Sequence, residues 1–210
     1  MNTWTDGLLI VLVLTNLRLL GTSRLSASIQ IVALQGIVMG VLPLVATGAD
    51  VLVLPLASIC LKGVVFPWLL LHSLREAKRL REIQPFVGYT ASLLAGIVML
   101  AAAIWMTGHL PLPAHEGPAL LVPVALFTVM VGLFVIVTRR TAAKQVLGYL
   151  SMENGIYAFG MAFVREEPFL VGVGILLDAF MAVFVMGIAI FHINREFDHI
   201  EVDRLDTLKG

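Results

Sequence analysis

Charged residues are scarce in this chain of 210 residues: they make up 13% of it, while hydrophobic residues make up 59%. Soluble globular domains carry roughly 25% charged residues, so this composition, with a mean hydropathy of +0.96, predicts an integral membrane protein. The formal net charge is zero. Binding to nucleic acid therefore has no electrostatic support and is not expected.

Cysteine is nearly absent as well. Cys60 is the only one in the sequence, which excludes an internal disulfide, and no Cys/His cluster of the kind that binds zinc, haem or an iron–sulfur centre is present. The sequence also lacks a nucleophile–base pair and a glycine-rich phosphate loop. We therefore expect no active site for bond-making chemistry, no metal and no cofactor in this chain itself.

Long apolar segments are what the sequence does contain, and they predict an all-α protein with seven transmembrane helices. A spanning helix needs about 20 apolar residues. The start of the chain lacks the basic region of a signal peptide, so we expect the first segment to be retained as a membrane helix. The predicted spans are 7–20, 26–47, 51–71, 86–107, 119–137, 143–164 and 169–191.

Basic residues orient these helices. If seven segments cross the membrane, nearly all Lys and Arg residues in or next to the connections fall on one side, which the positive-inside rule assigns to the cytoplasm. The N-terminus is then outside and the C-terminus cytoplasmic. The residues on the basic side are Arg18, Arg24, Arg75, Lys78, Arg79, Arg81, Arg139, Arg140, Lys144, Arg195, Arg204 and Lys209.

The order of helices and loops suggests two parallel repeats in a 3+1+3 arrangement, although apolar sequences also match by chance. The predicted parts are an N-terminal three-helix unit (1–75), a surface loop with a connecting helix (76–118), a second three-helix unit (119–195) and a cytoplasmic tail (196–210). In this alignment the region of Gln35 corresponds to that of Glu153.

Two acids lie near the middle of predicted spans: Glu153 in 143–164 and Asp178 in 169–191. Charges at bilayer depth are costly and usually functional. Two carboxyl groups at one level in adjacent antiparallel helices could exchange protons, which suits a proton relay. The alternative is that they stay protonated and only hydrogen-bond to neighbouring helices.

Lys62 is a third charge inside a predicted span. It could form an ion pair with Glu153 or Asp178, or act as a station in the relay. Pro55 and Pro67 flank it and leave backbone carbonyls without their helical partners, which predicts a bent segment.

Other polar residues could support the three charges. Two tyrosines lie one helical turn either side of Glu153 and could donate hydrogen bonds to it or simply pack. Two amides are expected to hydrogen-bond between helices, and two histidines at cytoplasmic helix ends could pass protons. These residues are Tyr149, Tyr157, Asn154, Gln35, His72 and His192.

The segment 138–155 carries a family resemblance. Thr138-Arg139-Arg140 followed by residues 146–155 resembles the K-type membrane subunit of respiratory complex I and of multisubunit cation/proton antiporters. In that family a basic loop leads into a helix with a buried glutamate, and the next helix carries a second buried acid. Glu153 matches the first acid and Asp178 the second, although Asp178 has a shorter side chain than the family's glutamate.

In its total size, with additional helices ahead of the K-type unit, the chain resembles hydrogenase-4 component E, a membrane subunit of formate hydrogenlyase-type and related group 4 nickel–iron hydrogenases. The resemblance implies a bacterial or archaeal cytoplasmic membrane, antiporter-like and other membrane-arm subunits as partners, and surrounding lipids. It also implies peripheral hydrogenase and iron–sulfur subunits that hold the nickel–iron centre and the clusters. Two alternatives remain at this point: a subunit of a sodium/proton antiporter, or a structural scaffold whose acids only hold helices together.

Overall fold

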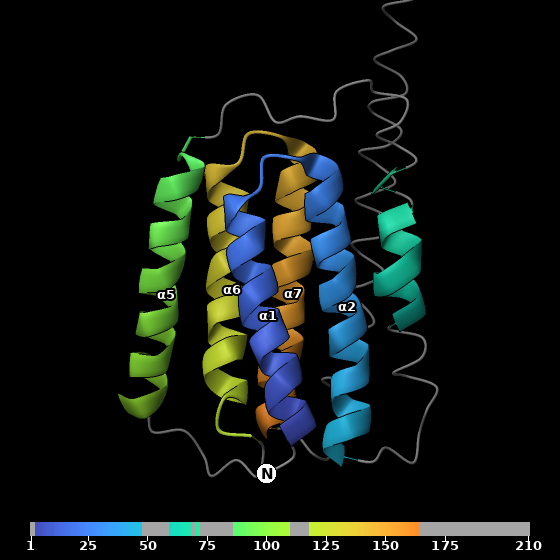
Figure 1. Ribbon diagram of the computed structural model, residues 1–210, viewed down its shortest axis with the longest axis vertical. Coiled ribbons are helices and arrows are strands. Elements are labelled where there is room, and N and C mark those ends of the chain that lie inside the picture. Colours follow the sequence, from blue (N-terminus) through green and yellow to red (C-terminus); the bar gives the residue numbers. More distant parts are fainter. Residues whose placement is uncertain (1–2, 48–58, 69, 72–85, 110–117, 164–210) are drawn as a thin grey trace, which may run out of the picture.

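The computed structural model describes residues 3–47, 59–68, 70–71, 86–109 and 118–163 (Figure 1). These residues are overwhelmingly helical, which confirms the predicted all-α fold. The helices are α1 (Thr3–Gly21), α2 (Leu25–Thr47), the π-helical segment η1 (Ile59–Val65), α5 (Tyr89–His109), α6 (Leu121–Thr138) and α7 (Ala142–Phe163).

The helix boundaries of α1, α2, α5, α6 and α7 agree with the predicted spans to within four residues. Of the predicted span 51–71 the structure describes only 59–68 and 70–71, and the span 169–191 lies outside the described residues. The number seven and the 3+1+3 arrangement therefore remain predictions.

Among the described residues, four helices are long and apolar enough to cross a membrane: Thr3–Gly21, Leu25–Val45, Tyr89–His109 and Leu121–Thr138. The sequence also predicted a span at 143–164. Helix α7 has 22 residues, enough in length, but it is more polar than those four. Its polar side chains include Lys144, Glu153 and Asn154, which are buried inside the bundle.

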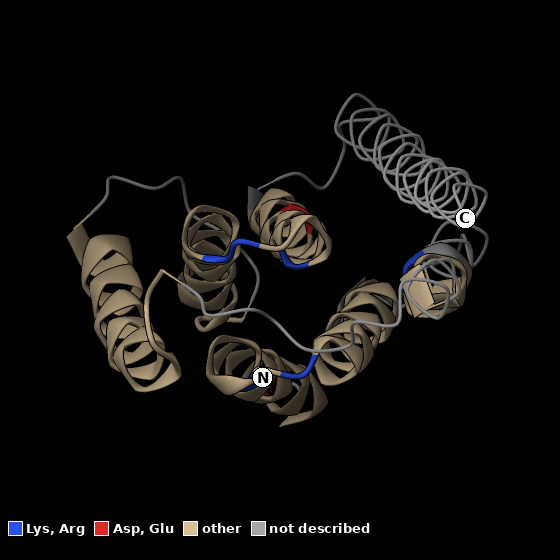
Figure 2. Cartoon of the chain, turned by 90° about the horizontal axis from the view of Figure 1, so that it is seen from above, with Lys and Arg blue, Asp and Glu red and all other residues tan. Residues whose placement is uncertain are grey.

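The helices form two rows, seen end-on in Figure 2. One row contains α6 and α7, and the other contains α1 and α2. The rows meet where α1 packs on α6 and α2 packs on α7. Helix α5 lies against α1 and α6 at one end of the rows, and η1 packs on α2 at the other. Lys62 on η1 and Glu153 on α7 therefore both lie beside α2.

Glycines allow α6 and α7 to pack with their backbones in contact. A Cβ atom on Gly132 would lie 2.5 Å from the backbone nitrogen of Met152 and 2.6 Å from the carbonyl oxygen of Gly148. A Cβ on Gly155 would lie 2.6 Å from the nitrogen of Val129. Small residues at helix contacts are a common way to bring membrane helices close together. The contact holds α7 against α6 along the stretch that includes Ser151 and Glu153.

Replacing Gly132 with alanine is expected to lower the free energy of unfolding by about 1–3 kcal/mol, because the backbone of α7 must move away from the new methyl group. Gly7→Ala is the matched control, since a Cβ at Gly7 meets nothing within 4 Å. That control should leave stability unchanged or raise it by up to about 1 kcal/mol. Unfolding by SDS in mixed micelles, followed by circular dichroism, compares the two. Equal stabilities for both variants would contradict the close α6–α7 contact.

Basic residues gather at one end of the bundle, at the top of Figure 1. Helices α1 and α6 end there, and α2, α5 and α7 begin there. Arg139 Nη2 donates to the carbonyl of Leu20 at 2.7 Å, and Lys144 Nζ donates to the carbonyl of Thr22 at 2.6 Å. Figure 2 shows basic residues on the α1–α2 and α6–α7 turns. We call this the basic end.

Candidate functional site

A buried ion pair joins η1 to α7. Lys62 Nζ lies 2.7 Å from Glu153 Oε1, and the side chains are 9% and 3% exposed. Glu153 lies eleven residues after the start of α7 and ten before its end. At 1.5 Å per residue it is about 15 Å from either end, which is mid-depth for a membrane helix. The ring of Tyr157 lies 5.8 Å from Lys62 Nζ, within the range of a cation–π contact.

Two glycines bring Lys62 close to the bundle. A Cβ on Gly36 of α2 would lie 2.7 Å from Lys62 Cβ and 3.0 Å from its carbonyl carbon. A Cβ on Gly63 would lie 2.7 Å from Ile37 Cγ1. The backbone of α2 at Gly36 therefore packs directly on the backbone of η1 at Lys62. Because η1 is π-helical, its hydrogen bonds run from i to i+5, an arrangement frequent at functional sites.

A second polar cluster lies between four helices, with Asn16 at its centre. Asn16 Nδ2 donates to Thr128 Oγ1 at 2.8 Å, and Gln35 Nε2 donates to Asn16 Oδ1 at 2.9 Å. Ser151 Oγ donates to the same Asn16 oxygen at 3.3 Å, and Gln35 Nε2 lies 3.4 Å from Thr15 Oγ1. All five residues are buried. They connect α1, α2, α6 and α7, and we call them the Asn16 cluster.

The Asn16 cluster and the ion pair share helices α2 and α7. Gln35 precedes Gly36, which contacts Lys62, and Ser151 lies two residues before Glu153. Gln35 thus makes the interhelical hydrogen bonds predicted for it. Two buried acceptors, Gln35 Oε1 and Asn154 Oδ1, have no hydrogen-bond partner among the described residues. Buried polar atoms of this kind usually bond to water or another group. Each of these two oxygens can therefore accept a hydrogen bond from a further donor.

The other predicted site residues fall into two groups. Tyr149 and Tyr157 are partly buried and pack against buried hydrophobic residues of the core. Asp178, His72 and His192 lie outside the described residues. The proposed meeting of Glu153 with a second acid therefore remains a prediction.

Sequence reasoning missed Asn16, Thr128 and Ser151. Asn16 lies in an apolar segment two residues before Arg18, so it looked like part of a polar helix end. An asparagine within an apolar segment is nevertheless a signal for an interhelical hydrogen bond. Thr128 and Ser151 gave no such signal, because either could have bonded to its own helix.

Two residues predicted as loop cations are in fact buried at the basic end. Arg139 is 0% exposed and Lys144 1%. Besides the bond to Leu20, Arg139 Nη2 lies 3.3 Å from Ser92 Oγ, and its guanidinium stacks 4.8 Å from the ring centre of Tyr89. Their hydrogen-bond acceptors are chiefly carbonyl groups near helix ends, where cations are favourable.

The site pairs one buried cation with one buried carboxylate. Within the parts of the chain that the structure describes, no group of three or more His, Cys, Asp or Glu residues could hold a metal ion. What the described residues provide is one cation, one carboxylate and a hydrogen-bonded polar cluster among membrane-length helices. The fold and the site thus define a polytopic helical membrane protein with an ionisable pair at mid-depth.

Comparisons with known proteins identify the family. Residues 120–210 match the family model for NADH-ubiquinone/plastoquinone oxidoreductase chain 4L. The chain is 31% identical over 207 residues to Uncharacterized protein Rv0085 of Mycobacterium tuberculosis, covering 94% of this chain and 92% of that protein. It is 37% identical over 120 residues to Hydrogenase-4 component E of Escherichia coli, covering 57% of this chain and 55% of that protein. No solved structure gives a significant match. The chain belongs to the family of hydrogenase-4 component E-type membrane subunits, which are related to the K-type (4L) subunit of complex I.

Proposed function

We propose that this chain is a non-catalytic membrane-arm subunit of a group 4, formate hydrogenlyase-like hydrogenase, and that it couples redox turnover to proton or ion translocation. The observation that carries the proposal is the Lys62–Glu153 pair at mid-depth, since charges there are costly and usually functional. Glu153 also lies in the region that matches chain 4L.

The ion pair supplies a mechanism for coupling. A movement of η1 or a new charge beside it separates Lys62 from Glu153, which leaves the carboxylate without its cation in a low-dielectric environment. Glu153 then takes up a proton, because burial disfavours the charged form. When the pair forms again, the proton is released. One cycle of separation and closure moves one proton on and off Glu153.

We propose that the Asn16 cluster forms part of the polar path to this carboxyl group. Hydrogen bonds join Gln35 on α2 to Asn16, and join Ser151 on α7 to Asn16. Asn16 lies five residues before the end of α1, so the path leads from mid-depth toward the basic end. Water bonded to Gln35 Oε1 and Asn154 Oδ1 would complete it. We propose that Asp178 is a further station of the relay and that Tyr149, Tyr157, His72 and His192 support it.

The proposed architecture follows from the same residues. Seven helices in a 3+1+3 arrangement, with parts 1–75, 76–118, 119–195 and 196–210, would place the basic end in the cytoplasm of a bacterial or archaeal cell. The N-terminus would be outside and the C-terminus inside. In support, α1 and α6 both run toward the basic end, and α2 and α7 both run away from it. Proposed partners are antiporter-like membrane subunits and peripheral subunits that hold a nickel–iron centre and iron–sulfur clusters.

Affinity purification tests the assembly. The chain, tagged at its C-terminus, is purified from native membranes in mild detergent, and the co-purifying subunits, nickel and iron are measured. We expect antiporter-like subunits together with metal-bearing peripheral subunits. Antiporter-like partners without metal would instead assign the chain to a sodium/proton antiporter and refute the hydrogenase role. Recovery of the chain alone would refute membership of any such complex.

A further inference from the structure

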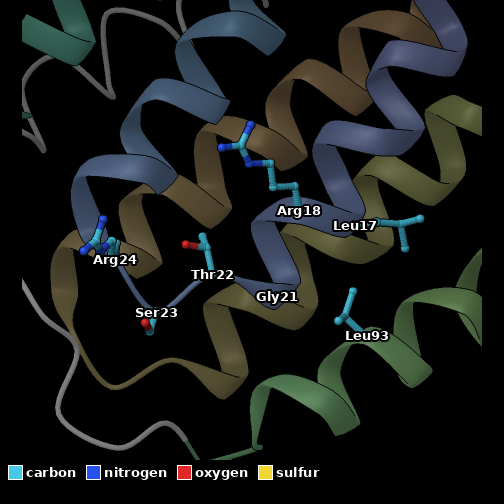
Figure 3. Close-up of a pocket in the computed structure, with 7 residues that line it drawn as sticks. All are labelled: Leu17, Arg18, Gly21, Thr22, Ser23, Arg24 and Leu93. Atoms are coloured by element: carbon cyan, nitrogen blue, oxygen red, sulfur yellow. The ribbon is translucent and has the colours of Figure 1, made fainter.

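A shallow cavity, largely open at the surface, lies at the basic end, where α1 turns into α2. It has a volume of about 440 Å³ and is lined by Leu17, Arg18, Gly21, Thr22, Ser23, Arg24 and Leu93 (Figure 3). Two arginines and two hydroxyl residues form its polar part. The residues come from α1, the α1–α2 turn and α5. The cavity is separate from the Lys62–Glu153 pair and takes no part in the function proposed above.

The wall of this cavity is fixed from inside the protein. Arg139 donates to the carbonyl of Leu20, and Lys144 donates to the carbonyl of Thr22. Both cations are buried behind the turn. Arg18 and Arg24, which are exposed, line the cavity on the outer side. Four cations thus surround one turn, whose backbone is held in place before any ligand binds.

The charge around the turn is one-sided among the described residues. Among all the residues that the structure describes, the only acids are Asp6, in the first turn of α1, and Glu153, at the middle of α7. Both lie away from the basic end. A cavity with two arginines and no nearby described carboxylate favours an anion, and guanidinium groups match phosphate oxygens in bidentate geometry.

The opposite wall of the cavity is apolar and continues along α5. In Figure 3, Leu17 and Leu93 lie on one side of the end of α1, and Arg24 and Thr22 lie on the other. Below Leu93, α5 exposes Leu94, Ile97 and Val98, with between 57% and 68% of each side chain accessible. Only 17% of the apolar window of α5 is buried inside the protein. The polar part therefore adjoins a surface that acyl chains can cover.

We propose that this cavity binds the phosphate headgroup of an anionic phospholipid in the leaflet at the basic end. Arg18 and Arg24 contact the phosphate, Thr22 and Ser23 donate hydrogen bonds to its oxygens, and the acyl chains lie along Leu93 and the exposed face of α5. Basic pockets between helices are a known form of lipid recognition, and each cation near an anionic membrane surface adds to the affinity.

Native mass spectrometry tests the site. The full chain, with any subunits that co-purify, is delipidated in detergent and titrated with phosphatidylglycerol, phosphatidylcholine or inorganic phosphate. We expect the wild type to retain one phosphatidylglycerol in preference to phosphatidylcholine, with inorganic phosphate unable to displace it. Arg18→Gln combined with Arg24→Gln should weaken retention about tenfold or more. Arg140→Gln is the control, because Arg140 is at the same end but does not line the cavity.

Several results would overturn the proposal. Equal retention of phosphatidylglycerol by the double variant, or an equal loss in Arg140→Gln, would show that the cavity arginines are not the binding groups. Binding or displacement by inorganic phosphate would assign the site to a free anion. A wild type that does not prefer phosphatidylglycerol would also refute it, and this result is independent of how the double variant folds. Arg18→Lys combined with Arg24→Lys, which keeps both charges, should retain more lipid than the glutamine variant.

Discussion

Replacing Lys62 with methionine is expected to lower the free energy of unfolding by about 3–5 kcal/mol, because Glu153 is left buried without its cation. The contact is short, at 2.7 Å, and neither side chain is more than 9% exposed. Methionine retains much of the aliphatic length of lysine, so packing against Gly36 changes little. Reversible unfolding in mixed micelles measures the difference.

The double variant Lys62→Met with Glu153→Gln separates the pair from its surroundings. Removing both charges from a buried site is often neutral or stabilising, so the double variant should recover most of the lost stability. A Lys62→Met variant as stable as the wild type would contradict a buried ion pair. A double variant no more stable than Lys62→Met would show that the loss came from packing alone.

Arg139→Gln is expected to be strongly destabilising, by about 3 kcal/mol or more, whereas Arg140→Gln should change stability by less than about 0.5 kcal/mol. Arg139 is fully buried and donates to Leu20 of α1 and Ser92 of α5, so it connects the end of α6 to two other helices. Arg140 is exposed and stacks on Phe86 at 4.2 Å.

The two neighbouring arginines make a closely matched comparison, since both substitutions remove the same charge from the same turn. Unfolding free energies from SDS titrations, with secondary structure followed by circular dichroism, are the measurement. If Arg140→Gln were as harmful as Arg139→Gln, the stabilisation would come from net charge at the basic end and the specific hydrogen bonds would be unimportant.

Hydropathy predicted the helices well because it depends only on local composition. The spans 26–47 and 143–164 match α2 and α7 to within one residue at each end. The depth of Glu153 also followed from its position in its segment. The sequence could not predict which acid pairs with Lys62. Lys62 and Glu153 are 91 positions apart, and their contact depends on how η1 and α7 pack around α2.

The other features that the sequence did not predict are backbone contacts and backbone geometry, which depend on how the helices pack. Arg139 looked like an ordinary loop cation because its partners are mainly carbonyl groups of other helices. Gly36 looked like a generic helix contact, yet its missing side chain is what lets Lys62 approach α2. The π-helical form of η1 was likewise not predicted; flanking prolines indicated only a bend.

Proton translocation by the variant complex tests the central claim most directly. The purified complex is placed in liposomes, and protons moved per redox turnover are measured for the wild type, Glu153→Gln, and Glu153→Gln with Lys62→Met. We predict that both variants assemble and turn over, and that protons moved per turnover fall to a small fraction of the wild-type value. The double variant should stay deficient although its stability recovers, because it has no carboxyl group to carry the proton. Normal proton movement per turnover in the double variant would contradict the claim and leave Lys62 and Glu153 as structural residues.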